Sequence, residues 1–241
     1  MPSQFARWTA WPNWPWQYDC PEHPVTMATT EILALDSAIG AIVPRDVLIQ
    51  ARQIAEGDEF ALLPGEAGAF ATSVVAVRRA SGTARMIARD LLLRLGHSQP
   101  EIAKAATGAP IWPKGIVGSI AHDARLAIAM VASEAGYQGL GVDIEPAEKL
   151  DLDLLGLVAT SNERQRIKDE PFGGRLLFAV KEAVYKAVFP LDGVFLDHQD
   201  VEVCLATGTA VICNGRIVKF RYCVASHIVA VAFVAALPMA S

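Results

Sequence analysis

Two carboxylates separated by one residue, Asp143 and Glu145, are the first candidates for chemistry in this sequence. They end an apolar segment that is typical of a β-strand, so their side chains are expected to point to the same side. Two such acids repel each other unless a proton or a cation lies between them. Mg²⁺ prefers a few carboxylates together with water and phosphate oxygens. The pair therefore fits a magnesium site, although solvated acids at an ordinary strand end fit it as well.

A second group of charged residues lies in the segment 175–189, for which we predict a helix ended by Pro190. Glu182 and Lys186 are four residues apart and share a face of this helix, next to Lys181. The same spacing is typical of a surface salt bridge. The flanking residues are mostly apolar, however, which favours a position beside a cleft.

His122 follows a short apolar segment, where an imidazole can contact a phosphate but more often has a structural role. Together with Ser119 it suggests a hydrolase, yet the G-x-S-x-G nucleophile elbow is absent. The sequence contains no phosphate-binding G-x-x-x-x-G-K-[ST] loop. The segment 139–141 lacks the third glycine of a dinucleotide fingerprint.

Charge is unevenly distributed along the 241 residues, whose net charge is −5. Residues 78–94 hold five arginines against one acid, and residues 143–153 hold five acids against one lysine. A basic segment followed by an acidic cluster suits an anionic ligand that carries a divalent metal, and two solvated faces would explain it too. The acidic balance disfavours a protein that coats nucleic acid.

These residues are positioned by a predicted mixture of helices and strands. Apolar residues at three- and four-residue spacing predict a helix over 74–95, with Gly96 just past its end. This helix places Arg78, Arg85 and Arg89 on or near one face. Strands are predicted over the segments 125–133, 140–144, 201–205, 210–213, 217–224 and 228–235, whereas 116–121 is noted only as a short apolar run. Because each half has a helix and several strands, we predict an α+β architecture of two related halves.

Residues 1–26 form a Trp/Pro-rich arm or extension without helical or strand periodicity, and translation starting at Met27 is an alternative reading. We divide the rest into an N-terminal half, 27–135, and a C-terminal half, 136–241, which carries the candidate metal site. No secretory signal opens the chain, and the four cysteines lack metal-ligand spacing, which favours a reducing compartment. The uncharged C-terminal segment is read as a buried strand rather than a membrane span. We expect a cytoplasmic protein.

In order along the chain, the helix motif R-x-x-A-R (85–89), APIWPKGIVGSIAHD (109–123), GVDIEP (141–146) and FAVKEAVYKAVFP (178–190) resemble the phosphopantetheinyl transferases of the surfactin and enterobactin-synthase type. The GVDIE and K-E-x-x-x-K elements are highly diagnostic as a pair. The resemblance extends from about Val77 to about Val203 and does not cover 1–26.

The resemblance implies a pseudo-dimer of two similar halves with the active site between them, and transfer of the phosphopantetheine arm of coenzyme A to a serine of an apo carrier protein with release of 3′,5′-ADP. It assigns Mg²⁺ to Asp143, Glu145 and Glu182, and makes Glu182 the candidate for activating the serine. Charge neutralisation at the pyrophosphate falls to Lys186. The residues implied to bind coenzyme A are His122, Lys186, Lys181, Arg85 and Arg78 or Arg79.

Two positions depart from the family pattern, because Ala121 replaces a frequent serine and Ala109 a frequent lysine. The lost phosphate contact would come from Lys114 or a backbone donor, so we expect altered affinity for coenzyme A. A coenzyme A-binding protein without transferase activity and a Mg²⁺-dependent phosphohydrolase are the alternatives. The resemblance implies a peptidyl, aryl or acyl carrier in siderophore or nonribosomal-peptide assembly, a monomer, and no nucleic acid or membrane partner.

Overall fold

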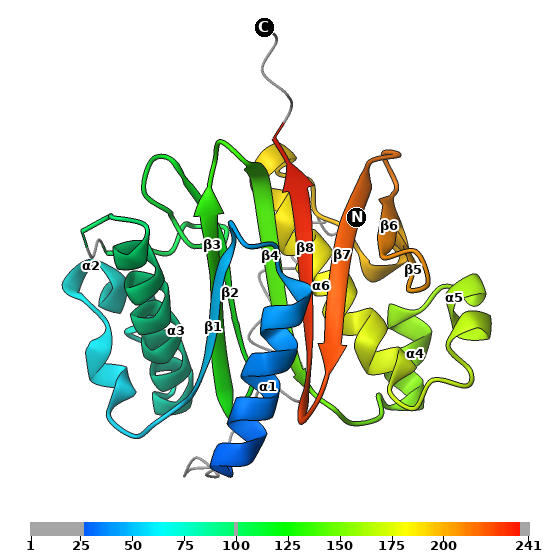
Figure 1. Cartoon of the computed structure of the whole chain (residues 1–241), viewed down its shortest axis with the longest axis horizontal. Coiled ribbons are helices and arrows are strands. Elements are labelled where there is room, and N and C mark those ends of the chain that lie inside the picture. The colour runs from blue at the N-terminus through cyan, green and yellow to red at the C-terminus, as the bar shows by residue number, and fades with distance from the viewer. Residues whose placement is uncertain (1–26, 99–100, 237–241) are drawn as a thin grey trace, which may run out of the picture.

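The computed structural model describes residues 27–98 and 101–236, so the predicted arm 1–26 lies outside the described residues. Within them the chain forms two antiparallel sheets, with strand orders β1–β3–β2 and β4–β8–β7–β6–β5 (Figure 1). The strands are β1 (Leu48–Gln53), β2 (Ile116–His122), β3 (Leu126–Ser133), β4 (Tyr137–Pro146), β5 (Val201–Cys204), β6 (Thr209–Ile212), β7 (Ile217–Val224) and β8 (His227–Ala235).

Two long helices, α3 and α6, dominate the helical part of the fold. The helices are α1 (Thr29–Ile42), α2 (Pro64–Ala67), α3 (Val75–Arg94), α4 (Leu152–Val158), α5 (Ser161–Arg166) and α6 (Gly173–Asp192), with short 3₁₀ turns η3 (Asp58–Ala61), η4 (Gly68–Phe70) and η5 (His198–Asp200). No helix of the described part of the chain is long and apolar enough to cross a membrane.

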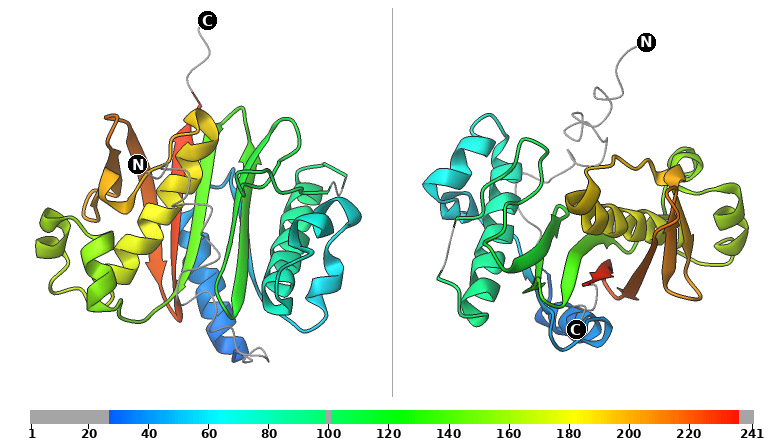
Figure 2. Two further views of the ribbon diagram at one scale, coloured as in Figure 1. Left: turned by 180° about the vertical axis from the view of Figure 1, so that it is seen from behind. Right: turned by 90° about the horizontal axis from the view of Figure 1, so that it is seen from above.

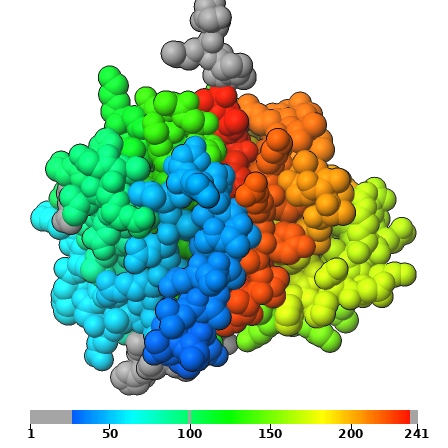
Figure 3. Space-filling view, in the orientation of Figure 1, coloured from blue at the N-terminus to red at the C-terminus, as the bar shows by residue number. Residues whose placement is uncertain are grey.

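The two sheets and their helices are arranged in layers, with α3 and α6 on the outer faces and α1 on the inner side (Figure 2). Alternation along β8 shows this directly. Ile228 and Ala230 pack with α6, whereas Val229 and Val231 join α1 and the first sheet in a central core. In the space-filling view α1 lies along the boundary between the two halves (Figure 3). Each half is thus an antiparallel sheet with a long helix on its outer face, which confirms the predicted α+β architecture of two similar halves.

The predicted helix 74–95 is confirmed as α3. Its buried face repeats at three- and four-residue spacing through Ala84, Ile87, Ala88 and Leu91, and packs on the first sheet. Gly96 adopts φ +83° just past the helix, where the Leu93 carbonyl accepts its N–H at 2.9 Å.

The predicted end of the second long helix is wrong. α6 continues through Pro190 to Asp192 and ends at Gly193, whose φ is +65° and whose N–H donates to the Phe189 carbonyl at 2.9 Å. A proline removes one helical hydrogen bond but does not forbid another turn when a left-handed glycine can close it. The predicted strands are all present, with ends shifted by at most a few residues. The chain passes from the first sheet to the second between Ser133 and Tyr137, and the division at residue 135 stays a prediction.

Two glycines let the α6 backbone lie directly on β4. A Cβ added at Gly141 would collide with the Ala183 carbonyl oxygen, and one added at Gly139 would collide with that of Ala187. Because alternate residues of a strand share a face, Asp143 lies on the same side of β4 as these glycines. The glycines that sequence patterns relate to nucleotide binding therefore serve helix–strand packing.

We predict that Gly141→Ala destabilises the fold by roughly 1–3 kcal/mol or more, because the new methyl group has backbone rather than a movable side chain in its way. Chemical denaturation measures this loss. The matched control is Gly156→Ala in α4, where the added Cβ meets nothing within 4 Å and the free energy of unfolding should be unchanged or slightly higher. Equal stability of the two variants would contradict the proposed packing.

Candidate active site

The candidate site lies where the edges of the two sheets meet. β2 and β4 belong to different sheets, and the Val142 N–H donates across the junction to the Ser119 hydroxyl at 3.1 Å. His122 is the last residue of β2, so this junction carries its imidazole toward the acidic end of β4. Ser119 is buried and engaged in this bond, which gives it a structural role in place of the nucleophile considered above.

Each of the three predicted metal-binding carboxylates has a basic partner. Asp143 Oδ1 lies 2.6 Å from Lys186 Nζ. Glu145 Oε2 lies 3.1 Å from an Arg175 guanidinium nitrogen, and Glu182 Oε1 lies 3.0 Å from His198 Nε2. The Asp143–Lys186 pair joins β4 to α6, and it brings Asp143 within electrostatic range of Glu182.

Burial and mutual repulsion raise the pKa values of Asp143 and Glu145. Burial raises the pKa of Asp143 to about 6; Lys186 opposes the rise and Glu182 adds to it. Burial and the charge on Asp143 raise the pKa of Glu145 to about 8, against the pull of Arg175. Burial lowers the pKa of the Lys186 ammonium, but the charges on Asp143 and Glu182 outweigh it and raise that pKa above its ordinary value. The negative charge of the three carboxylates exceeds the positive charge of Lys186 and Arg175 beside them.

The donor atoms suit a hard divalent cation. In the described part of the chain, Asp143 Oδ2 and Glu182 Oε2 are buried oxygens without a hydrogen-bond partner. No three His, Cys, Asp or Glu side chains within the described ranges already stand at metal-binding spacing. Each acid instead keeps one oxygen on its basic partner. The two unsatisfied oxygens are the ligand type that Mg²⁺ prefers, and they are the observation that makes the residues fit such an ion.

His122 lies within electrostatic range of this cluster. Part of the His122 side chain is accessible to solvent. The surrounding protein lowers the pKa of the imidazole through partial burial, and the Lys186 ammonium lowers it further. The neighbouring Asp123 is fixed by a partner that the sequence did not reveal, because His227 Nε2 lies 2.9 Å from its Oδ2. This buried contact joins the β2–β3 turn to β8 and holds the end of β2 in place.

The three α3 arginines that the resemblance assigns to coenzyme A are engaged with neighbouring protein groups. Arg79 pairs with Glu59 at 2.9 Å, and this hydrogen bond lowers the pKa of Glu59 to about 2. Arg78 donates to the Ser73 carbonyl at 2.6 Å. Arg85 is buried and donates to the Ile102 carbonyl at 2.9 Å. Arg78 and Arg79 thus have partners other than the three carboxylates of the candidate metal site.

A cation that sequence reasoning missed is Lys104. Its Nζ lies 5.1 Å from the centre of the Phe70 ring, and the Arg85 guanidinium lies 4.7 Å from the same centre. Lys104 also forms an isolated β-bridge with Pro110, directly beside Ala109. It therefore lies next to the position from which the expected lysine is missing, and only the three-dimensional pairing reveals this.

Lys181 lies inside the protein. Its side chain is 1% exposed, and its Nζ donates to Glu163 Oε2 at 2.7 Å and to the Val158 and His198 carbonyls at 2.8 and 2.7 Å. Glu163 in turn accepts the Val203 N–H at 2.6 Å. These contacts occupy all three donors of the ammonium, so the geometry gives Lys181 a structural role in place of the one implied for coenzyme A.

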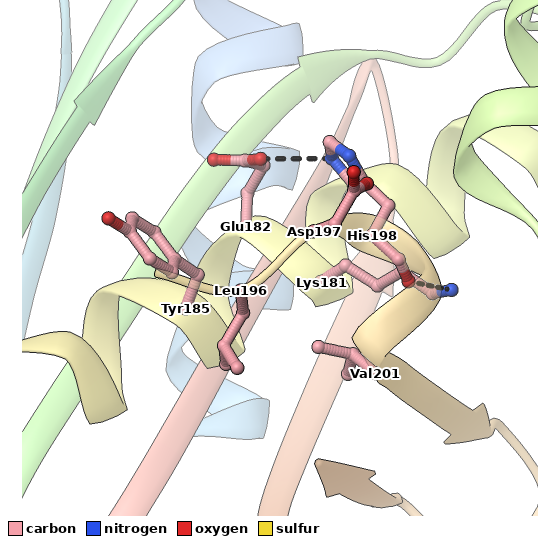
Figure 4. A pocket seen from close by; sticks show the side chains of 7 residues that line it. All are labelled: Lys181, Glu182, Tyr185, Leu196, Asp197, His198 and Val201. Atoms are coloured by element: carbon pink, nitrogen blue, oxygen red, sulfur yellow. Dashed lines mark hydrogen bonds and ion pairs between the residues drawn. The ribbon is translucent and has the colours of Figure 1, made fainter. Parts of the chain in front are cut away.

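A small pocket opens beside Glu182 and contains a residue that sequence reasoning missed, His198 (Figure 4). The pocket is lined by side chains from α6 and from the segment that follows it: Lys181, Glu182, Tyr185, Leu196, Asp197, His198 and Val201. In the close-up the His198 ring points at the Glu182 carboxylate. No local spacing relates these two residues, so a sequence pattern could not have paired them.

Comparison with known proteins places the same segments in one group. Residues 65–132 match the family model for the 4′-phosphopantetheinyl transferase N-terminal domain, and residues 139–235 match that for the 4′-phosphopantetheinyl transferase superfamily.

Three curated relatives illustrate the similarity. The 4′-phosphopantetheinyl transferase Npt of Nocardia iowensis is 37% identical over 58% of this chain and 64% of that protein. Svp of Streptomyces mobaraensis, which carries the same description, is 35% identical over 60% of this chain and 61% of its own. Enterobactin synthase component D of Salmonella typhimurium is 36% identical over 32% of this chain and 34% of that protein. The chain thus spans less than two thirds of the length of these relatives.

We predict that Lys181→Met destabilises the protein by about 3–5 kcal/mol, because it leaves the buried Glu163 carboxylate without its cation. Chemical denaturation measures the loss. Lys168→Met is the control, since Lys168 is 72% exposed and its removal should change the free energy of unfolding by less than about 0.5 kcal/mol. A Lys181→Met protein of normal stability but weakened coenzyme A binding would return Lys181 to the ligand-binding set.

Proposed function

Because the chain belongs to the 4′-phosphopantetheinyl transferase superfamily, we propose that it transfers the phosphopantetheine arm of coenzyme A to a serine of an apo carrier protein. In this reaction the serine oxygen attacks the phosphorus that bears the pantetheine, and the bond from that phosphorus to 3′,5′-ADP breaks. The observation that carries the proposal is the convergence of two unsatisfied carboxylate oxygens with the Lys186 ammonium at the junction of the sheets.

The carboxylates provide the metal-binding part of the proposed site. Asp143 and Glu182 would hold Mg²⁺ through Oδ2 and Oε2, and Glu145 would complete the acidic set beside Asp143. Bound Mg²⁺ supplies positive charge to the pyrophosphate of coenzyme A. Glu182 is also the residue best placed to accept the serine proton, directly or through water. Catalysis then depends on positioning and charge neutralisation, as phosphoryl transfer generally does.

Basic residues from both halves would bind the phosphates. Lys186 approaches from α6 and would stabilise the charge that develops on the departing 3′,5′-ADP. His122 at the end of β2 would contact a phosphate from the opposite half. Lys104, which lies over the same Phe70 ring as Arg85, is the proposed candidate for the 3′-phosphate of the nucleotide, whereas the buried Arg85 would have to release the Ile102 carbonyl to reach it. Arg78 and Arg79 would have to leave their present partners to take part.

The proposal extends to partners and location. A peptidyl, aryl or acyl carrier is the proposed macromolecular substrate, and the relative described as enterobactin synthase component D supports a place in siderophore or related assembly. We propose that the protein is a cytoplasmic monomer without nucleic acid or membrane partners. Cys204, Cys213 and Cys223 are free thiols, which agrees with a reducing compartment.

Intact-protein mass spectrometry of apo carrier proteins incubated with this protein, coenzyme A and Mg²⁺ tests the reaction. We expect each accepted carrier to gain the mass of one phosphopantetheine, and EDTA to abolish the gain. A panel of peptidyl, aryl and acyl carriers identifies the substrate class. No gain on any carrier, together with measured binding of coenzyme A, would replace the transferase with a binding protein. Release of phosphopantetheine or inorganic phosphate without a carrier would indicate a phosphohydrolase.

We predict that Lys186→Ala lowers kcat about 100- to 1,000-fold and changes KM for coenzyme A much less, because the ammonium acts on charge that develops in the transition state. Initial rates at several coenzyme A concentrations separate the two parameters. Lys168→Ala, on the exposed surface, is the control and should leave both unchanged. An effect restricted to KM would show that Lys186 binds the ground state only.

A further inference from the structure

The Glu182 carboxylate is held on one side only. Oε1 lies 3.0 Å from His198 Nε2, while Oε2 is buried without a hydrogen-bond partner in the described part of the chain. Both side chains are almost fully buried, with residue exposures of 5% for Glu182 and 7% for His198. This is a close polar contact between a ring nitrogen and a carboxylate oxygen. The contact therefore fixes which oxygen of Glu182 faces the protein and which stays free.

His198 is itself fixed from two directions. Its ring stacks on Phe178 of α6 with centres 5.3 Å apart and an angle of 24° between the planes. Its backbone carbonyl accepts a hydrogen bond from Lys181 Nζ at 2.7 Å. The ammonium that makes this bond is anchored to the buried Glu163. A side chain restrained at ring and backbone loses little further entropy when it orients another group.

We propose that His198 is a positioning residue that turns Glu182 so that its free oxygen faces the metal, an inference that rests on the proposed function. Carboxylates that bind a metal are generally contacted by outer polar residues, which orient the ligands and set the affinity. Lys181 then contributes indirectly, because it holds the turn that carries His198. Lys181, which precedes Glu182 in the diagnostic motif, thus helps to position the Glu182 carboxylate through His198.

The test compares four variants by titration of Mg²⁺ into the protein with coenzyme A and without a carrier, followed by calorimetry. His198→Phe keeps a ring against Phe178 but removes the nitrogen, and should raise the Kd for Mg²⁺ about 10- to 100-fold. His198→Gln keeps an N–H with similar reach and should restore most of the affinity. His198→Asn carries the same amide on a shorter side chain, should bind as weakly as His198→Phe, and replaces it if the phenylalanine variant does not fold.

Gln199→Ala is the matched control for disturbance of the same 3₁₀ turn. Its amide donates to the Leu157 carbonyl at 2.9 Å rather than to Glu182, so the Kd for Mg²⁺ should stay at the wild-type value. In transfer assays the His198→Phe defect should shrink as Mg²⁺ is raised, because the residue acts on ligand orientation. A defect that excess Mg²⁺ leaves unchanged would overturn the inference.

The remaining outcomes separate the inference from the proposed function. Wild-type affinity for Mg²⁺ in His198→Phe, failure of His198→Gln to recover affinity, or an equal loss in Gln199→Ala would each overturn the role of His198. A wild-type protein that binds no Mg²⁺ would overturn it as well. If the variants rank as expected and yet no carrier is modified, the positioning role is supported and the transferase assignment fails.

Discussion

The backbone contact between α6 and β4 determines the position of every acid in the candidate site. Gly139 and Gly141 leave room for the carbonyl oxygens of α6 on one face of the strand. Two and four residues beyond Gly141, where side chains return to the same face, stand Asp143 and Glu145. A helix that lies this close presents Glu182 and Lys186 to those acids without long or flexible side chains between them. A larger residue at either glycine would move the helix, and the distances within the site would change together.

A buried ionic cluster below the site carries the second constraint. Glu163 accepts hydrogen bonds from Lys181, from the Val203 backbone and, at its own helix start, from Thr160. It thereby fastens α5, α6 and β5 to one another. Removing two charges from water is costly, and these contacts offset the cost only because the donors and acceptors are matched. The Lys181 ammonium also donates to the His198 carbonyl. This lysine, the most buried of the chain, therefore contributes both to the stability of the fold and to the position of His198 beside the candidate site.

Local patterns were sufficient to predict six of the described strands, both long helices and the acids of the site, because periodicity and strand alternation are local properties. They were insufficient wherever partners are distant in sequence. Arg79 belongs to a basic segment, yet Glu59 engages it. Lys181 belongs to a diagnostic motif, yet its function in the structure depends on Glu163. Pro190 predicts a helix end that Gly193 postpones, since the final turn is decided by the residue that can adopt a left-handed backbone. α1 and β1 were not predicted from the sequence, and for β2 only the short apolar run 116–121 was recognised.

The junction between β2 and β4 affects how the protein unfolds under force or on heating. Strands on either side of it belong to different sheets and have no backbone ladder between them, so the halves can separate at the expense of packing and of contacts such as that between Ser119 and Val142. A ligand that contacts His122 on one edge and Asp143 on the other would connect the two halves across this junction. The two halves would then unfold as one cooperative unit, and ligand binding would raise the free energy needed to separate them.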